Sequence, residues 1–176
     1  YRNVGLIVAM AYQWCQRLGD MRMLTWDSID FQRQRMYLVQ SKRRAEVFLP
    51  IDDGLFTMLN DQYQDCGFQP YIAPHPRPVG GTFNPYAMER LSKVGRKVMR
   101  EAELPDTLRL MDLRRTGVTQ MMEAGVPLPQ IMSVTGHTHV ASVKPYMKNT
   151  FASANNALTA RHAHVELSVT NNIESV

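Results

Sequence analysis

The sequence predicts one α+β domain that is mainly helical, with a small antiparallel sheet near its N-terminal side. Dense apolar residues at 3–16 predict a buried helix. Two short strand-like runs, 36–39 and 47–49, flank a basic turn at 41–45, which is the pattern of a β-hairpin. Apolar residues at helical spacing occupy most of the remaining chain.

The rest of the chain predicts one long loop, a mobile C-terminal end and several further helices. Residues 64–84 contain four prolines and predict a long surface loop, and 168–176 are polar and predicted to be mobile. The predicted helices are, in order, 54–63, one that begins at Pro85 and ends near Ala102, 112–123, one from Pro127 that ends at Gly136, 140–148 and 153–161.

Length and composition describe one folded domain without a disulfide scaffold. The chain has 176 residues, of which 44% are hydrophobic and 20% charged, and these values exclude global disorder. No apolar run reaches the roughly 18 residues of a membrane-spanning helix. Cys15 and Cys66 are too few for a disulfide framework and fit a reducing cytoplasmic compartment. No Cys/His group has zinc-ligand spacing, so no metal site is expected.

The charge balance favours a polyanionic partner. Twenty Lys and Arg against 16 Asp and Glu give a net charge of +4, with a pI near 9.2. Tyr1 is not a methionine, and an apolar helix is predicted almost at once. We therefore expect the chain to be a fragment that lacks an N-terminal part.

Side chains suited to phosphoryl transfer recur along the chain. Arg17 follows the first helix, Lys42 lies in the hairpin turn, Arg114 begins a helix, and Tyr146 follows His137 by nine positions. Arginine matches phosphate oxygens in a bidentate way, lysine can protonate a leaving oxygen, and tyrosine can act as a nucleophile. No carboxylate cluster suggests Mg²⁺, so the cations have to be side chains. Each residue alone is typical of a structural role, but their order together indicates a site.

These segments together resemble the catalytic domain of the tyrosine recombinases, the phage integrase family. The resemblance implies a catalytic domain at 1–150 and a C-terminal helical tail at 151–176, with an N-terminal core-binding domain absent from the chain. Asp20, in the first box, would orient its neighbours. The matching segments are 16–20 with 24–29 (first arginine), 40–42 with 47–50 (lysine hairpin), 112–116 (second arginine), and 136–137 with Tyr146.

The resemblance implies a role for each matched residue. Tyr146 would attack the scissile phosphate, form a 3′-phosphotyrosyl bond and free a 5′-hydroxyl. Arg17 and Arg114 would hold the nonbridging oxygens, His137 would donate a further hydrogen bond to them, and Lys42 would be the general acid. No metal or cofactor would be needed, because the phosphotyrosyl bond conserves the energy of the broken ester.

Met111 departs from the pattern, because the family usually has His or Lys at this position. Methionine cannot accept or donate a useful proton, so the usual partner for the proton of Tyr146 is missing. Either the site tolerates Met111 or the enzyme is impaired; we expect tolerance, because the other catalytic positions are intact. His139 is expected to face solvent rather than to substitute.

DNA is the partner that the resemblance implies, bound by a homotetramer that exchanges C-terminal tails, with no membrane involved. Basic side chains in the hairpin and at helical spacing either form solvated faces or contact the DNA backbone. The expected DNA-binding residues are Arg43, Arg44, Arg90, Lys93, Lys97 and Arg100, and the expected docking face of the tail is Ala152, Ala154, Ala157 and Leu158.

A site-specific recombinase, the integrase of a phage or mobile element, is therefore the expected function, in the cytoplasm of a bacterial host and associated with its nucleoid. Two alternatives remain. Residues 127–133 before Gly136 and His137 could be taken for a helix-turn-helix reader, so the chain could be a non-catalytic DNA-binding regulator; Met111 favours this alternative. A type IB topoisomerase-like relaxing enzyme would use the same chemistry without strand exchange.

Overall fold

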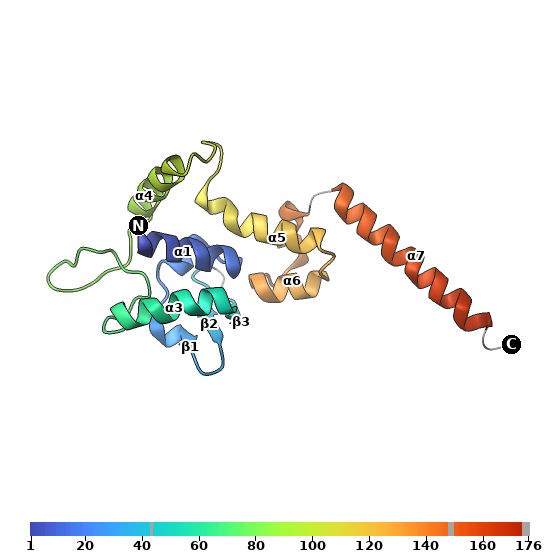
Figure 1. The fold of residues 1–176 in the computed structure, drawn as a ribbon, viewed down its shortest axis with the longest axis horizontal. Coiled ribbons are helices and arrows are strands. Elements are labelled where there is room, and N and C mark those ends of the chain that lie inside the picture. Colours follow the sequence, from blue (N-terminus) through green and yellow to red (C-terminus); the bar gives the residue numbers. More distant parts are fainter. Residues whose placement is uncertain (43, 148–149, 174–176) are drawn as a thin grey trace.

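The computed structural model describes residues 1–42, 44–147 and 150–173, and side chains up to residue 167 except those at the same gaps. The fold is mainly helical with one small sheet, as predicted (Figure 1). Its elements are α1 (Arg2–Gln13), α2 (Leu18–Met21), η1 (Trp26–Ser28), β1 (Ile29–Asp30), β2 (Arg35–Val39), β3 (Glu46–Pro50), α3 (Asp53–Cys66), α4 (Met88–Glu101), η2 (Leu110–Asp112), α5 (Leu113–Glu123), α6 (Leu128–Thr135), η3 (Val140–Ser142), η4 (Lys144–Tyr146) and α7 (Phe151–Ile173).

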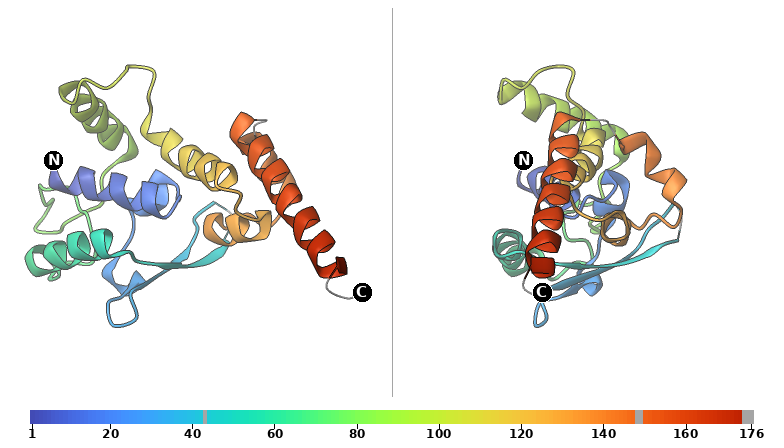
Figure 2. Two further views of the ribbon diagram at one scale, coloured as in Figure 1. Left: turned by 45° about the vertical axis from the view of Figure 1, so that its right-hand side comes forward. Right: turned by 90° about the vertical axis from the view of Figure 1, so that its right-hand side faces the viewer.

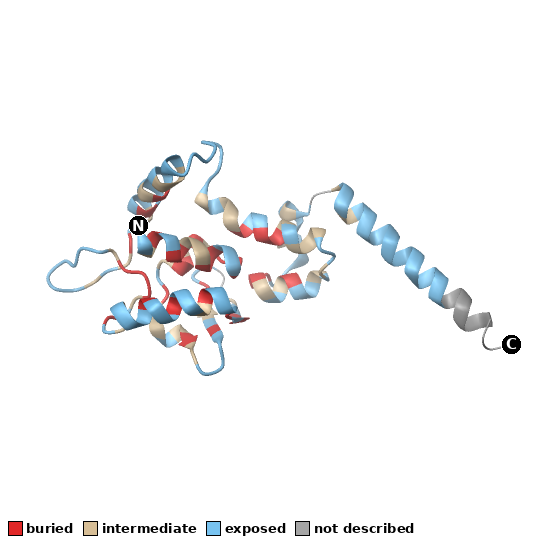
Figure 3. Ribbon diagram, viewed as in Figure 1, coloured by how far each residue is buried: buried red, intermediate tan, exposed pale blue. Residues whose placement is uncertain are grey.

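Helix α1 lies at the centre of the domain, with α3, α4 and α5 around it. Its apolar residues recur with helical period, so Ile7 and Met10 are fully buried. Buried residues concentrate in α1 and in the segments that surround it, whereas α7 is exposed along its described length (Figure 3). The main core therefore forms around the first helix and positions the residues that follow it.

The predicted hairpin is confirmed. The sheet has the order β1-β2-β3, with both pairs antiparallel, and Met36 pairs with Leu49. Alternate residues of each strand face the core, so Met36 and Leu49 are buried, whereas Tyr37 and Phe48 lie on the outer face with ring centroids 4.7 Å apart. The sheet thus presents the basic turn after β2 at one end of the core.

A second small core joins α5, α6 and the residues before Tyr146. Val118, Ile131 and Val143 are its fully buried members. Gly117 brings α5 close to the main core, because a Cβ at this position would lie 2.3 Å from the sulfur of Cys15. The close approach of α5 to the end of α1 brings the two arginine segments together.

Two predictions for the middle of the chain were wrong. Helix α3 continues to Cys66, and the following segment is not a surface loop throughout, because Ile72 and Ala73 are buried and the Ile72 amide donates to Leu24. Helix α4 begins at Met88, not at Pro85, which instead forms an antiparallel bridge with Pro74. The prolines end regular structure here without excluding the segment from the core.

The C-terminal part also differs from the prediction. The described part of the helix predicted at 140–148 forms two short 3₁₀ turns, η3 and η4, since Pro145 has no amide hydrogen for a continuous helix; Lys148 lies outside the described residues. The predicted helix at 153–161 is part of α7, which also contains 168–173, predicted to be mobile; residues 174–176 lie outside the described residues. Among the described residues, no helix, α7 included, combines the length and apolar character that a membrane crossing requires.

Helix α7 stands at the edge of the molecule, on the side of α5 and α6 and away from α3 and α4 (Figures 1 and 2). It contacts α5, where the Asn156 amide donates to the carbonyl of Glu123. Beyond this contact its apolar residues, Leu158 among them, remain exposed.

Candidate active site

Arg17 lies between α1 and α2, directly before the first residue of α2. Its side chain is about a quarter exposed (26%), and its Nη1 lies 3.8 Å from Oδ2 of Asp20. The buried Asp20 also accepts a hydrogen bond from the Ser41 amide through Oδ1, at 3.1 Å. Asp20 therefore links the first arginine to the hairpin turn that carries Lys42, as its expected orienting role requires.

Arg114 lies in the first turn of α5 and is only 6% exposed. Its Nη2 donates to the carbonyl of Thr135 at 2.7 Å and lies 3.3 Å from Nε2 of His137. Its Nη1 is buried and has no hydrogen-bond partner among the described residues. Within the described residues, no carboxylate forms an ion pair with this guanidinium.

The electrostatic environment of Arg114 follows from this geometry. The pKa of Arg114 is lowered to about 10, mainly by burial and also by the positive charge of Arg17, while the neighbouring Tyr146 acts in the opposite direction. Asp20 lies beside Arg17, whereas Arg114 has no carboxylate partner among the described residues, so the two guanidinium groups together carry an excess of positive charge. Such a pair is suited to bind an anion.

His137 packs behind the second arginine and beside Tyr146. The Thr135 hydroxyl donates to the carbonyl of Ile131 at 2.8 Å, so it accepts at 2.7 Å from Nδ1 of His137. On this assignment, Nε2 of the neutral ring accepts from Arg114. The ring centroids of His137 and Tyr146 are 5.8 Å apart. In this arrangement the histidine orients Arg114.

A cleft of about 430 Å³ brings the candidate residues together. Arg17, Lys42, Arg114 and Tyr146 all line it, although they come from four segments far apart in the sequence. His137 is not part of the lining; it borders a separate hollow next to Glu46, Ser133 and Thr138.

Two further residues line this cleft. Met111 is 77% exposed, so the position of the usual histidine holds a solvent-facing thioether. Arg115, which the sequence does not predict to be catalytic, is exposed at the same cleft.

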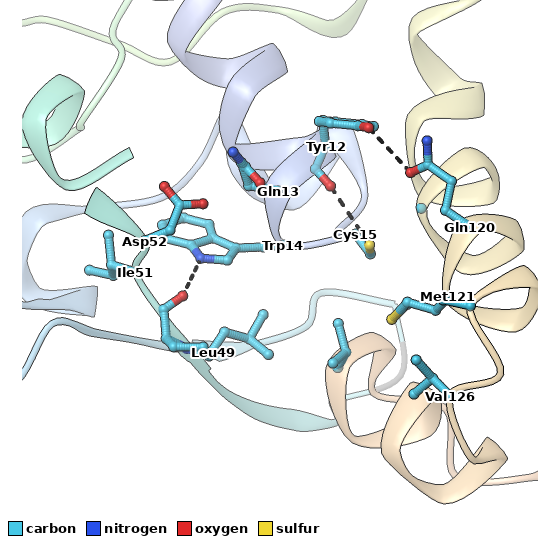
Figure 4. Close-up of a pocket in the computed structure, with 14 residues that line it drawn as sticks. Tyr12, Gln13, Trp14, Cys15, Leu49, Ile51, Asp52, Gln120, Met121 and Val126 are labelled. Carbon is cyan, nitrogen blue, oxygen red and sulfur yellow. Dashed lines mark hydrogen bonds between the residues drawn. The ribbon is translucent and has the colours of Figure 1, made fainter. Parts of the chain in front are cut away.

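A larger pocket of about 520 Å³ lies apart from these residues, between α1, β3 and α5 (Figure 4). Trp14, Met121 and Val126 give it a mainly apolar lining. Two hydrogen bonds connect the segments that line this pocket. Trp14 Nε1 donates to the Pro50 carbonyl at 2.9 Å, and the Tyr12 hydroxyl donates to Gln120 at 3.2 Å (Figure 4). It contains none of the predicted catalytic residues.

The expected DNA-binding residues of α4 are all exposed: Arg90, Lys93, Lys97 and Arg100. Two of them have acidic neighbours, since Lys97 lies 3.7 Å from Glu101 and Arg100 lies 3.8 Å from Asp106. Such exposed pairs are weak, so α4 still presents a basic face. Arg44 is exposed in the hairpin turn, whereas Arg43 lies outside the described residues.

The sequence analysis assigned no role to three buried polar residues at the site. Gln16, Gln40 and Thr135 are each at most 1% exposed. One signal was available for Gln40, because it continues the alternation that turns Met36 and Leu38 of β2 inward. A polar residue at an inward position of a strand indicates a buried hydrogen-bonding role.

Comparison with known proteins identifies the class of protein. A model of the phage integrase family matches residues 3–153. The chain therefore belongs to the phage integrase family. No curated protein sequence matches it closely.

Solved structures share the fold. XerA recombinase has a TM-score of 0.72 and 16% identity over 91% of this chain. A lambda integrase dimer bound to a COC′ core site has a TM-score of 0.67 and 18% identity over 84%. The Tn1549 transposon integrase in complex with transposon right end DNA has a TM-score of 0.66 and 15% identity over 93%. The alignments cover 57%, 42% and 60% of those chains, so this chain spans about half the length of these proteins.

Proposed function

We propose that this chain is the catalytic domain of a site-specific DNA recombinase of the integrase type. One observation carries the proposal. The buried Nη1 of Arg114 has no hydrogen-bond partner in the described part of the chain, although Arg17 adds a second positive charge and Tyr146 lines the same cleft. A buried charge without a counter-ion is costly, and a phosphodiester would supply both the negative charge and the missing acceptor.

The reaction follows from the side chains in the cleft. The phenol oxygen of Tyr146 attacks the scissile phosphorus, and the bond from phosphorus to the 5′-oxygen breaks. Lys42 gives a proton to the departing oxygen, while Arg17 and Arg114 bind the nonbridging oxygens, on which charge increases. A 3′-phosphotyrosyl bond results. Attack by a 5′-hydroxyl of another strand then reverses the step and rejoins the DNA.

His137 has two roles in this proposal. Its Nε2 accepts from Arg114 and so holds the guanidinium in place. Donation to a phosphate oxygen, the role expected from the sequence, requires Nε2 to carry a proton and to turn from Arg114 towards the phosphate. Met111 cannot take the proton of Tyr146, so we propose that this proton passes to solvent water at the open cleft and that the two arginines stabilise the resulting tyrosinate enough for the reaction to proceed.

The partners are double-stranded DNA and further copies of the chain. The exposed basic face of α4 supports contact with the DNA backbone. A lambda integrase tetramer bound to a Holliday junction shares the fold, with a TM-score of 0.65 and 16% identity over 84% of this chain. We propose a homotetramer in which α7 exchanges between copies, because its expected docking residues are exposed in the described chain: Ala152, Ala154, Ala157 and Leu158.

The proposed division of the chain is a catalytic domain at 1–150 and a C-terminal tail at 151–176. In the full-length protein, an N-terminal core-binding domain would complete the DNA-binding surface. The proposed location is the cytoplasm of a bacterial host, in association with its nucleoid.

A non-catalytic DNA-binding regulator is the second candidate, and the observation that favours it is Met111, exposed at the cleft in place of a proton acceptor. The deciding experiment uses a pool of short duplexes with randomised sequence around a single nick close to the cleavage position. Loss of the short fragment beyond the nick traps a covalent intermediate, which denaturing gel electrophoresis detects. A recombinase gives a covalent protein–DNA band; a regulator gives a shifted band on a native gel and no covalent band.

A further inference from the structure

Gln40 follows β2 directly and precedes Lys42 by two residues. Its side chain is fully buried, yet it lies against Arg17, Gln16 and the carbonyl of Thr135. The proposed reaction gives it no role. Its three contacts join the end of α1, the lysine hairpin and the end of α6.

The orientation of Gln16 is fixed by groups that can only accept hydrogen bonds. Its Nε2 donates to the carbonyls of Trp14 at 2.8 Å and Val134 at 2.7 Å. The opposite amide orientation would place Oε1 against both carbonyls. Oε1 of Gln16 therefore faces Gln40 and requires a donor.

The orientation of Gln40 follows in turn. Its Nε2 donates to Oε1 of Gln16 at 2.6 Å and to the Thr135 carbonyl at 2.8 Å. This leaves Oε1 of Gln40 as the acceptor for Nη1 of Arg17, at 3.1 Å. Rotation of this amide would oppose oxygen to oxygen at two contacts, so a single orientation is stable.

We infer that Gln40 is a positioning residue that holds the Arg17 guanidinium in the orientation needed to bind a phosphate. The Thr135 carbonyl accepts from both Gln40 and Nη2 of Arg114, so one peptide group sets the placement of both arginines. This role rests on the proposed function, because it assumes that the two arginines bind one phosphate.

The first test measures the rotation of the Arg17 guanidinium and the affinity of the site for inorganic phosphate, which serves as the probe. In Gln40→Met, which keeps the length of the side chain without its hydrogen bonds, NMR should show faster rotation of the Arg17 guanidinium. Phosphate affinity should fall roughly tenfold, the effect of losing about one hydrogen bond to a charged group. The matched control is Gln62→Met, because Gln62 is also buried and donates to Asn3 and Ile72, away from the cleft.

The control variant should lose thermal stability without changing the Arg17 signals or the phosphate affinity. The inference is overturned if Gln40→Met changes neither the rotation of the Arg17 guanidinium nor the phosphate affinity. It is also overturned if Gln62→Met changes these two quantities as much as Gln40→Met does. Should Gln40→Met not fold, Gln16→Met removes only the group that orients Gln40, and it should give the same changes in a weaker form.

The second test is a double-mutant cycle on the nicked DNA pool. Gln40→Met should lower the single-turnover cleavage rate at saturating DNA by up to roughly 10²-fold, with little change in the DNA concentration that gives half-maximal rate. In the Arg17→Ala background the same substitution should add little, because the residue it positions is gone. Equal losses in both backgrounds would overturn the inference. If the unmodified chain cleaves nothing, the proposed function fails, while the phosphate measurement still decides the role of Gln40.

Discussion

Arg17 and Arg114 lie close enough for the positive charge of Arg17 to lower the pKa of Arg114. Burial is the larger cause, and the pKa of about 10 lies below the ordinary value of an arginine side chain. The folded protein therefore holds the protonated Arg114 less favourably than the unfolded chain does, and this cost is fully present at neutral pH. Without an anion, the site therefore lowers the stability of the folded protein, as is common where function requires an unfavourable arrangement of charges.

Arg114→Met should therefore lower DNA cleavage without lowering the stability of the folded protein. Removing a buried charge without an ion-pair partner is expected to leave the free energy of unfolding unchanged or to raise it by about 1–4 kcal/mol. DNA cleavage should fall by roughly 10²–10³-fold, as for other losses of a preorganised donor. Thermal unfolding and single-turnover cleavage measure the two effects. Arg115→Met is the control, because its exposed side chain should affect both much less; equal effects at the two positions would mean that the wrong arginine was assigned.

Sulfate should stabilise the unmodified chain through the same site. An anion that binds only the folded protein raises its stability by mass action, by about 2.7 kcal/mol at a concentration of 100 times Kd. The melting temperature should rise with sulfate more than with sodium chloride at equal ionic strength. Arg114→Met should lose this difference, and an undiminished difference in that variant would place the anion elsewhere.

Gly136 tests the contact between the end of α6 and Gln40. Gly136 and Gly125 both have positive φ, of 67° and 75°, so an alanine at either position strains the backbone by roughly 1–3 kcal/mol. Only at Gly136 would a Cβ meet Gln40, at 2.8 Å from Nε2; at Gly125 nothing lies within 4 Å. Gly136→Ala should therefore lose cleavage well beyond Gly125→Ala at comparable stability. Equal cleavage rates would contradict a role for this contact.

Met111→His should raise the cleavage rate modestly and shift the pH profile of cleavage towards neutral pH. A histidine here would supply the proton acceptor that the site lacks, and positioned acid–base groups contribute roughly 10²–10⁴-fold in other enzymes. A smaller gain is expected because, in the proposed reaction, the arginines already stabilise the tyrosinate. Single-turnover cleavage across pH is the measurement. If only the histidine variant cleaves DNA, the chain as it stands is a binding protein.

The four candidate catalytic residues that line the cleft could be selected from the sequence, because each is a chemically distinctive side chain in a characteristic local setting. The hairpin was predictable as well, since strand alternation turns Met36 and Leu49 inward. Local pattern could not show that Ile72 is fully buried inside a proline-rich segment, because its partner, Leu24, is distant in the sequence.

The network around Gln40 was hidden for the same reason. The Val134 carbonyl accepts from Gln16 and the Thr135 carbonyl accepts from Gln40, and a backbone carbonyl leaves no signal in a sequence. The position of His137 against Arg114, outside the cleft lining, likewise depends on how α5 and α6 pack. The continuity of α7 through 168–173 was missed because polar composition suggested mobility, although it also permits an exposed helix.

Covalent trapping at Tyr146 tests the central claim most directly. After incubation with the nicked DNA pool, the protein–DNA adduct is digested and the modified peptide is located by mass spectrometry. Tyr12→Phe is the matched control, because its hydroxyl bonds to Gln120 at the apolar pocket, away from the cleft. The account predicts a phosphotyrosyl adduct on Tyr146, retained in Tyr12→Phe and lost in Tyr146→Phe, which should still bind DNA. An adduct that persists in Tyr146→Phe, or that maps to another residue, would contradict it.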